Sequence, residues 1–191
     1  MAQSRVVRPP RGRITDATLR RRIADRVQLH LGLEELDLLA DEPRSAVRVT
    51  GWPADPDALD DFLAEPNLSR IATVDRDGAL HVVPAWYWWD GARFWIGAQA
   101  TDRKVANVRR AGRAAVEIDS DIRRRRGILA RGPARVISGD AGRAEYLRIT
   151  AEQVRRYQPN RPPTETAARY AEKGSPVVIE VTPERIIGWG R

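Results

Sequence analysis

The stretch ALHVVPAWYWWDGARFWIG, residues 79–97, contains four of the six tryptophans of the chain. Apolar and aromatic residues fill most positions on both sides of Asp90-Gly91, a dipeptide typical of a two-residue hairpin turn. This pattern predicts two antiparallel strands, at 79–89 and 92–98, joined directly by that turn.

The predicted register puts aromatic residues on both faces of this hairpin. With a two-residue turn, Trp86 pairs with Trp95 and Tyr87 with Phe94. One face then carries Trp86, Trp88, Arg93 and Trp95, and the other carries Tyr87, Trp89 and Phe94. A sheet wetted on one side alternates apolar with polar residues, so both faces must be covered. The barrel core covers one; a partner chain, a terminal segment or a flat ligand covers the other. The plainer alternative is that every ring is core or dimer packing.

Pro84 interrupts the first strand of the hairpin. Proline cannot donate to the ladder of a sheet, so it belongs at an edge or a bulge. Such a position leaves neighbouring backbone N–H and C=O groups free for a planar polar ligand.

The rest of the chain predicts further strands with a period of two, and few helices. Strands are expected at 68–74, 79–89, 92–98, 114–119, 128–137 and 177–181, and helices at 57–65, from 102 onward, at 141–157 with Asp140 as its cap, and at 164–173. Hairpin-linked strands with few helices between them indicate a mainly β fold, a small antiparallel barrel rather than a doubly wound sheet. No G-x-G-x-x-G or P-loop pattern occurs, which excludes those nucleotide sites.

The positive charge of the chain is concentrated at its N-terminus. Residues 1–30 carry eight arginines against two aspartates, whereas residues 31–191 carry 25 basic and 24 acidic side chains. A basic arm can bind nucleic acid, but a solvated, partly disordered extension is the simpler interpretation. Apolar residues recur at helical spacing over 15–39. We therefore interpret residues 1–57 as a basic, partly helical extension and 58–191 as the barrel domain.

The chain has no cysteine, and its two histidines, His30 and His81, lie far apart. Disulfides and thiolate chemistry are excluded, and a metal site is not expected. The N-terminus lacks the apolar segment of a signal peptide, and no apolar run has the length of a membrane span. We expect a cytoplasmic protein without a membrane partner.

Two cations lie at the start of the helix predicted from Asp102. Arg103 and Lys104 occupy its first turn, where the helix dipole favours negative charge. Free backbone N–H groups at that end attract anions, so a bound phosphate would offset the two cations. The alternative is an exposed Arg–Lys pair on a solvated helix. A second basic run, 123–126, is interpreted as a solvated loop, or as a second anion contact if it lies on the same side of the barrel.

An ordered series of fragments resembles a known family. The fragments LSRIATVDRDGALHVVPAWYWWDG, RKVANVRR, ILARGPARVI and PERIIGW together are similar to the pyridoxamine 5′-phosphate oxidase-like split β-barrel superfamily, especially to its flavin- or deazaflavin-dependent oxidoreductases. The resemblance covers about residues 58–189. It implies a six-stranded antiparallel split barrel of the FMN-binding type, preceded by the helical N-terminal extension.

The resemblance also implies a cofactor and an assembly. Two chains pair as a homodimer, and two equivalent sites for FMN or F420 form along their interface. The residues placed around the cofactor are Val83, Pro84, Ala85, Trp86, Gly97, Ala98, Arg103, Lys104, Asn107 and Trp189. The strand that holds Pro84 runs beside the ring, Arg103 and Lys104 bind the phosphate, and Trp189 lies near the ring.

Three departures from the family pattern bear on the substrate. His81 stands where pyridoxamine phosphate oxidases have an arginine, and no Arg-x-His segment follows Trp189. Gly97-Ala98 offers only backbone where those enzymes bind phosphate through a hydroxyl group. Pyridoxamine phosphate is therefore not the expected substrate, and the choice between FMN and F420 stays open.

The leading hypothesis is hydride transfer between F420 or FMN and a small planar unsaturated substrate. The cofactor carries this chemistry while the protein supplies orientation and electrostatics, so no catalytic residue is assigned and His81 is expected to be structural. A non-catalytic flavin or F420 binding protein, used for storage or sensing, is the alternative. A nucleic-acid-binding protein that uses the basic arm is a third, and we do not favour it.

Overall fold

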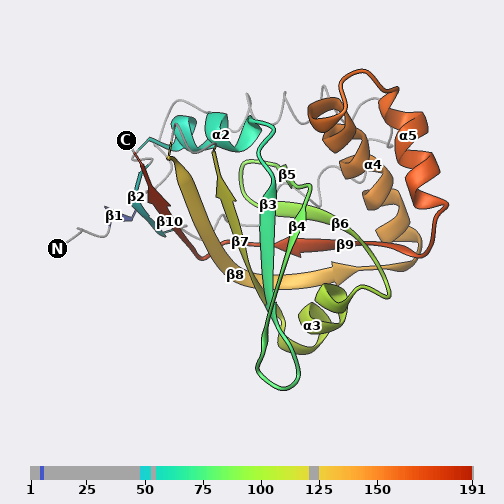
Figure 1. The fold of residues 1–191 in the computed structure, drawn as a ribbon, viewed down its shortest axis with the longest axis horizontal. Helices are drawn as coiled ribbons and strands as arrows, with labels where there is room; N and C mark the ends of the chain where they lie inside the picture. The colour runs from blue at the N-terminus through green and yellow to red at the C-terminus, as the bar shows by residue number, and fades with distance from the viewer. Residues whose placement is uncertain (1–4, 7–47, 53–54, 121–124, 191) are drawn as a thin grey trace, which may run out of the picture.

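A computed structural model describes residues 5–6, 48–52, 55–120 and 125–190. Its described part is a mainly antiparallel half-barrel of strands with helices packed on it (Figure 1). The strands are β1 (Arg5–Val6), β2 (Arg48–Gly51), β3 (Ser69–Val74), β4 (Leu80–Ala85), β5 (Trp88–Trp89), β6 (Phe94–Gln99), β7 (Arg113–Asp119), β8 (Gly127–Ile137), β9 (Pro176–Val181) and β10 (Arg185–Trp189). The helices are α2 (Pro56–Ala64), α3 (Arg103–Ala111), α4 (Gly139–Tyr157) and α5 (Pro163–Ala171).

The longest strand, β8, joins the two parts of the sheet. Its first seven residues pair with β7, and its last four, 134–137, pair with β9. The strand order is β1-β2-β10-β8-β7-β3-β4 on one side, and β9, β6 and β5 continue from β8 on the other. The strand paths that run out from β8 therefore end at β1, at β4 and at β5. The predicted mainly β split-barrel class is confirmed, with one parallel pair, β2 with β10, among the described strands.

The predicted tryptophan hairpin has the wrong register. Trp88 lies opposite Trp95, and Trp89 opposite Phe94, so the loop contains four residues rather than two. The carboxylate of Asp90 explains the longer loop, because Oδ1 accepts the Ala92 and Arg93 N–H groups at 2.8 and 2.7 Å. Its Oδ2 accepts the indole N–H of Trp95 at 2.8 Å. The expected single strand over 79–89 is also divided, because β4 ends at Ala85 and β5 begins at Trp88.

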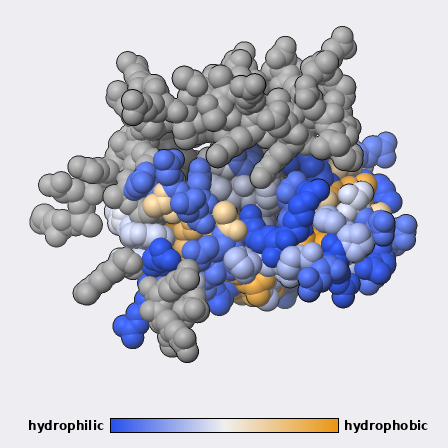
Figure 2. Space-filling model, turned by 90° about the horizontal axis from the view of Figure 1, so that it is seen from above, coloured by the Kyte–Doolittle hydropathy of each residue, from blue (hydrophilic) through white to orange (hydrophobic). Residues whose placement is uncertain are grey.

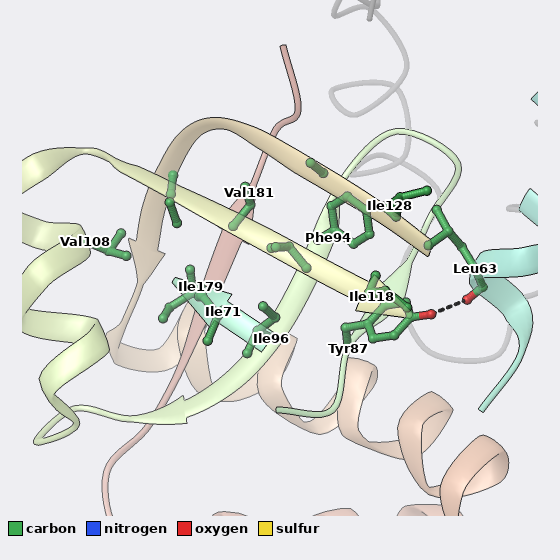
Figure 3. Close-up of a cluster of buried hydrophobic side chains, with 14 of the residues drawn as sticks. Leu63, Ile71, Tyr87, Phe94, Ile96, Val108, Ile118, Ile128, Ile179 and Val181 are labelled. Atoms are coloured by element: carbon green, nitrogen blue, oxygen red, sulfur yellow. Dashed lines mark hydrogen bonds between the residues drawn. The ribbon is translucent and has the colours of Figure 1, made fainter. Parts of the chain in front are cut away.

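The faces of the hairpin are nevertheless as predicted, since a shift of two residues keeps each side chain on its face. Tyr87 and Phe94 are fully buried in the barrel core, and Trp89 packs against that core (Figure 3). The Tyr87 hydroxyl donates to the Leu63 carbonyl at 3.0 Å, which ties α2 to the end of the core. Burial is the main cause that raises the pKa of Tyr87 far above its ordinary value.

The second face is covered by the chain's own helices. Trp95 lies in a cluster with Tyr146, Ile149, Ala171 and Val178, which come from α4, α5 and β9. Trp88 packs against the same cluster, and the Arg148 guanidinium lies 4.3 Å from its ring centroid. The expectation of an external cover for this face was wrong, because the amphipathic pattern of 141–171 did not reveal which sheet it meets.

The two helix starts that the sequence assigned to aspartates differ in detail. The N-cap of α4 is Ser138, and Asp140 lies in the first turn of that helix, where it is favourable to the dipole. Asp102 is the N-cap of α3, but its side chain makes no capping hydrogen bond. The short helix expected at 164–173 is present as α5, and that expected at 57–65 is present as α2.

The N-terminal part contributes strands that the sequence did not predict. β2 pairs with β10, and β1 pairs with β2. The helix expected over 15–39 lies outside the described residues, and the domain boundary at 57 stays a prediction. None of the described helices is long and apolar enough to cross a membrane. Seen from above, the described surface is mostly hydrophilic, with hydrophobic colour in small patches (Figure 2).

Candidate functional site

The edge strand β4 presents free backbone groups. Among the described strands its partner is β3 alone, and Pro84 lies opposite Arg70. Because proline has no N–H, this pair belongs to the non-hydrogen-bonded set of the antiparallel ladder, as does the pair of Val82 with Ala72. The N–H and C=O of Val82 and the C=O of Pro84 therefore point away from β3, towards the edge of β4 that no described strand pairs with, which we call the opening of the barrel. The prediction that Pro84 lies at a sheet edge is confirmed.

A second free edge belongs to β6. β5 pairs with β6 at Phe94 and Trp95, and the residues after these have β9 as their described strand partner. Gly97 and Ala98 lie in this portion. A Cβ on Gly97 would lie 3.0 Å from the Tyr146 ring, so the glycine makes room for α4 on that face. Ala98 is buried in the barrel core. Both residues could reach a ligand through backbone alone, as the sequence indicated.

The chain after β6 turns directly into α3, which carries the predicted anion site. The Asp102 carboxylate accepts the Gln99 N–H at 3.0 Å and pairs with the Lys104 ammonium at 2.5 Å. Because this carboxylate does not cap the helix, it accepts no hydrogen bond from the first backbone N–H groups of α3. The helix start can therefore bind an anion, although Lys104 already has an internal partner.

The neighbouring cation, Arg103, also has an internal partner. Its Nε lies 3.2 Å from the Asp75 carboxylate at the β3–β4 turn, and its side chain is 67% exposed. Asn107, which is buried, donates to the same carboxylate at 2.7 Å and to the Thr73 hydroxyl at 3.1 Å. The Arg110 guanidinium donates to the side-chain oxygen of Asn107, Oδ1, at 3.2 Å. The hydrogen bonds of Asn107 therefore hold α3 against β3, and its side chain is not an exposed ligand contact.

The ion pair at Lys104 perturbs the titration of Asp102. Partial burial acts to raise the pKa of Asp102, but the hydrogen bonds from Lys104 and from the Gln99 N–H outweigh it and hold the pKa below its ordinary value. A carboxyl group with a lowered pKa in the fold stabilises the protein above its ordinary pKa. That contribution is lost as the pH falls through the lowered value.

Two predicted site residues lie apart from α3. Trp86 stacks on Tyr157 of α4, with the ring centroids 5.0 Å apart and the planes at 12°. Trp189 lies opposite Gly127, and its ring occupies the space where a Cβ of that glycine would be. This is the end of the sheet where β3 begins, whereas Asp75 and α3 lie beyond its other end. Six residues of strand at about 3.3 Å each separate the two ends by roughly 20 Å, and Figure 1 shows α3 and the C-terminus on opposite sides.

The sequence missed several residues that shape this region. A shallow hollow beside α3 is lined by Asp75, Arg76, Asp77, Arg103, Asn107 and Arg110. In the sequence, residues 75–78 are typical of a tight turn, and nothing local shows that Asp75 meets a helix 28 residues further on. The one available signal was Asn107, a polar residue between Val105 and Val108 on the inward side of α3.

The basic run 123–126 is described only in part. Arg126 lies 3.8 Å from the Glu65 carboxylate, and its guanidinium lies 5.2 Å from the Trp52 ring centroid. Residues 123 and 124 lie outside the described residues, so the role of the run as a whole stays a prediction.

The outward face of β3 and β4 is apolar. Leu80 is 79% exposed, Val82 54% and Val74 43%. These three side chains are neighbours, because Val74 lies opposite Leu80 and Ala72 opposite Val82. Contiguous exposed apolar surface on a sheet marks an interaction face more often than a solvated one.

The residues around α3 and the two free edges fit a phosphate-bearing planar cofactor. Arg103 and Lys104 supply cations, the first turn of α3 supplies N–H donors, and Val82 and Pro84 supply backbone groups beside the opening. Asp102 and Asp75 hold the two cations in place, so an incoming phosphate must compete with them.

His81 lies on β4, half-buried, opposite Thr73. The Thr73 hydroxyl donates to its backbone carbonyl at 3.5 Å, and no described carboxylate hydrogen-bonds its ring. We therefore expect His81→Gln to leave the turnover of any substrate nearly unchanged, measured by steady-state kinetics. A general acid or base contributes a hundredfold or more, so a loss of that size would show that His81 transfers a proton.

The chain has the architecture of a known class of proteins. A mainly antiparallel half-barrel with a few helices packed on it is the architecture of the split-barrel proteins. The family model described as pyridoxamine 5′-phosphate oxidase matches residues 55–190, and the chain belongs to this family. None of the curated proteins matches the chain.

Solved structures agree with this fold. A conserved hypothetical protein, Rv2991 from Mycobacterium tuberculosis, superposes with a TM-score of 0.60 at 22% identity, over 71% of this chain and 84% of that one. A protein described as an F420 reductase gives 0.52 at 25% identity, over 66% and 94%. The heme storage protein HutZ from Vibrio cholerae gives 0.55 at 15% identity, over 69% and 92%. Proteins of this one fold are thus named for different functions. The fold alone therefore does not identify the cofactor, which must be argued from the chemistry of the site.

Proposed function

We propose that the chain is an oxidoreductase that binds F420 or FMN and transfers a hydride to or from a small planar unsaturated substrate. The cationic start of α3, next to two free strand edges in a member of this family, is the observation that carries the proposal. When bound, the cofactor supplies the hydride chemistry. Lys104 and Arg103 hold its phosphate, and the free backbone groups of Val82 and Pro84 orient its ring.

The site is completed by a second copy of the chain. The exposed Val74, Leu80 and Val82 give each copy an apolar face beside the opening of its barrel. Trp189, 40% exposed, lies roughly 20 Å from α3 in its own chain. One cofactor can contact both of these residues only if Trp189 comes from one copy and Lys104 from the other. Covering the sheet face in this way also shields the ring from water.

The homodimer is tested by mass. Light scattering should give about twice the 21.5 kDa mass of one chain. Val82→Asp should shift the protein towards monomer, because it places a charge in the apolar face that the pairing buries. Arg109→Asp, on the exposed surface of α3, is the control and should leave the mass unchanged. A monodisperse monomer for the unsubstituted chain would refute a site shared between two copies.

The cofactor is tested by titrating the protein separately with FMN and with F420. Binding of either one should be saturable at one molecule per chain and should change the fluorescence of the cofactor. A chain that binds neither excludes the proposed function. Binding of heme with neither flavin nor F420 would exclude it as well.

Turnover separates an enzyme from a storage or sensing protein, which is the alternative that the same binding site would serve. The reduced cofactor is bound under anaerobic conditions and mixed with a panel of planar enones and quinones. An enzyme reoxidises it faster than buffer does for at least one acceptor. A rate equal to that of buffer for every acceptor would favour the non-catalytic alternative.

A further inference from the structure

Three arginines stand side by side on the outward face of β2, β10 and β8. Arg185 lies opposite Arg48 on one side and opposite Arg131 on the other. Their side chains point away from the core, because the adjacent Ile186, on the other face of β10, is buried. Neighbouring strands are about 4.8 Å apart, so the Cα atoms of the three arginines span about 10 Å.

The described part of the chain supplies no counter-charge to this row. Among the described residues no carboxylate forms an ion pair with any of these arginines. The carboxylate of Glu184, the residue before Arg185, forms its ion pair with Arg113 at 2.6 Å. Elsewhere on the sheet the pattern is different. Arg70 is held by Asp119 at 2.7 Å and Glu117 at 2.9 Å, and these hydrogen bonds raise the pKa of Arg70 above its ordinary value.

The side chain of Arg185 also has a buried nitrogen without a partner. Its Nε is buried from solvent and has no hydrogen-bond acceptor. Buried donors in folded proteins are nearly always paired, and like charges directly opposite each other in a sheet are destabilising. Both exceptions meet at Arg185, which favours an anionic ligand at this row.

We propose that this row, Arg48, Arg185 and Arg131, binds a linear chain of three or more phosphates. Guanidinium groups present paired donors that match phosphate oxygens. A phosphate chain carries a charge on every link and can meet all three arginines. An extended acidic peptide presents side chains to one face only every second residue, about 6.8 Å apart, and meets two of them. None of the three arginines belongs to the cofactor site proposed at α3.

Isothermal titration calorimetry of the full chain tests the proposal, with tripolyphosphate, orthophosphate and tetraglutamate as probes. Tripolyphosphate should bind at one site per chain, at least tenfold more tightly than orthophosphate or tetraglutamate. Arg131→Gln and Arg185→Gln should each weaken it about tenfold. Arg169→Gln, which removes the same charge from the exposed surface of α5, should change it less than twofold.

Thermal unfolding without ligand gives a readout that a structural role would not produce. Arg131→Gln should keep or raise the melting temperature, because it relieves repulsion from Arg185. Tripolyphosphate at a fixed concentration should then raise the melting temperature of the unsubstituted chain more than that of the variant. Absence of saturable binding, equal weakening by Arg169→Gln, or tetraglutamate binding as tight as tripolyphosphate would each overturn the phosphate site. Loss of binding in Lys104→Ala alone would assign the anion to α3 instead.

Discussion

Lys104→Ala is expected to weaken the binding of FMN or F420 about 10- to 150-fold. Hydrogen bonds to charged groups contribute about 1.5–3 kcal/mol, and every 1.4 kcal/mol is a factor of ten in affinity. Lys104 is positioned for this role, because its ammonium is held at the start of α3 by Asp102 and its side chain is 15% exposed. Calorimetric titration of both cofactors against the variant measures the effect.

Asp102→Asn is the matched variant, with the opposite expected sign. The amide oxygen can still accept the Gln99 N–H, but the negative charge that competes with phosphate for Lys104 is gone. Cofactor binding should therefore become tighter in Asp102→Asn and weaker in Lys104→Ala. If Lys104→Ala and Arg103→Ala both keep the affinity for FMN and F420, α3 does not hold the cofactor phosphate.

The ion pair also reverses an expectation about the protein without ligand. From the dipole of α3 alone, removal of Lys104 should be neutral or slightly stabilising. With Asp102 as its partner, removal leaves a partly buried carboxylate with the Gln99 N–H alone, and we expect a loss of about 1 kcal/mol near neutral pH. Because the pKa of Asp102 is lowered, this loss should shrink as the pH falls below about 4. Denaturant unfolding at pH 7 and pH 3 measures the difference.

The tryptophan hairpin shows what local sequence can and cannot predict. Period-two patterning assigned Tyr87 and Trp95 to opposite faces, because alternation is a property of the strand itself. The loop length depended on one carboxylate, Asp90, whose hydrogen bonds favour four residues over the two that Asp-Gly usually gives. The cover over Trp95 depended on where α4 returns to the sheet, and no local pattern carries that information.

The candidate site likewise has features that local sequence predicts and others that it does not. The edge position of Pro84 and the cationic start of α3 were predicted, because both depend on backbone chemistry within a few residues. The partners of those cations were not. Asp75 reaches Arg103 only because the β3–β4 turn extends past α3, and the three arginines of the row come from segments more than 50 residues apart in sequence.

Gly132→Ala is expected to destabilise the fold severely, because this glycine lies where β8 passes from one part of the sheet to the other. A Cβ there would lie 2.0 Å from the carbonyl oxygen of Thr182 and 2.9 Å from the nitrogen of Glu184. Both are backbone atoms of the segment that links β9 to β10. That segment cannot move aside, because its own N–H groups bond the carbonyls of Pro133 and Arg131 at 3.0 and 3.1 Å. Close approach of two backbones at a barrel corner is a position that only glycine fills.

Overpacking against a side chain costs about 1–3 kcal/mol, and more where the neighbour is fixed, so we expect a loss of at least about 3 kcal/mol. In a chain of this size each kcal/mol lowers the melting temperature by about 2–4 °C, which gives a fall of about 6–12 °C or more by calorimetry. Gly139→Ala is the control. Gly139 has a φ of +70° but open space around its Cβ position, so it should show only the cost of left-handed backbone, about 1 kcal/mol. Equal losses in the two variants would mean that β8 can bend at this corner without glycine, and that the closeness of the two backbones does not hold the half-barrel together.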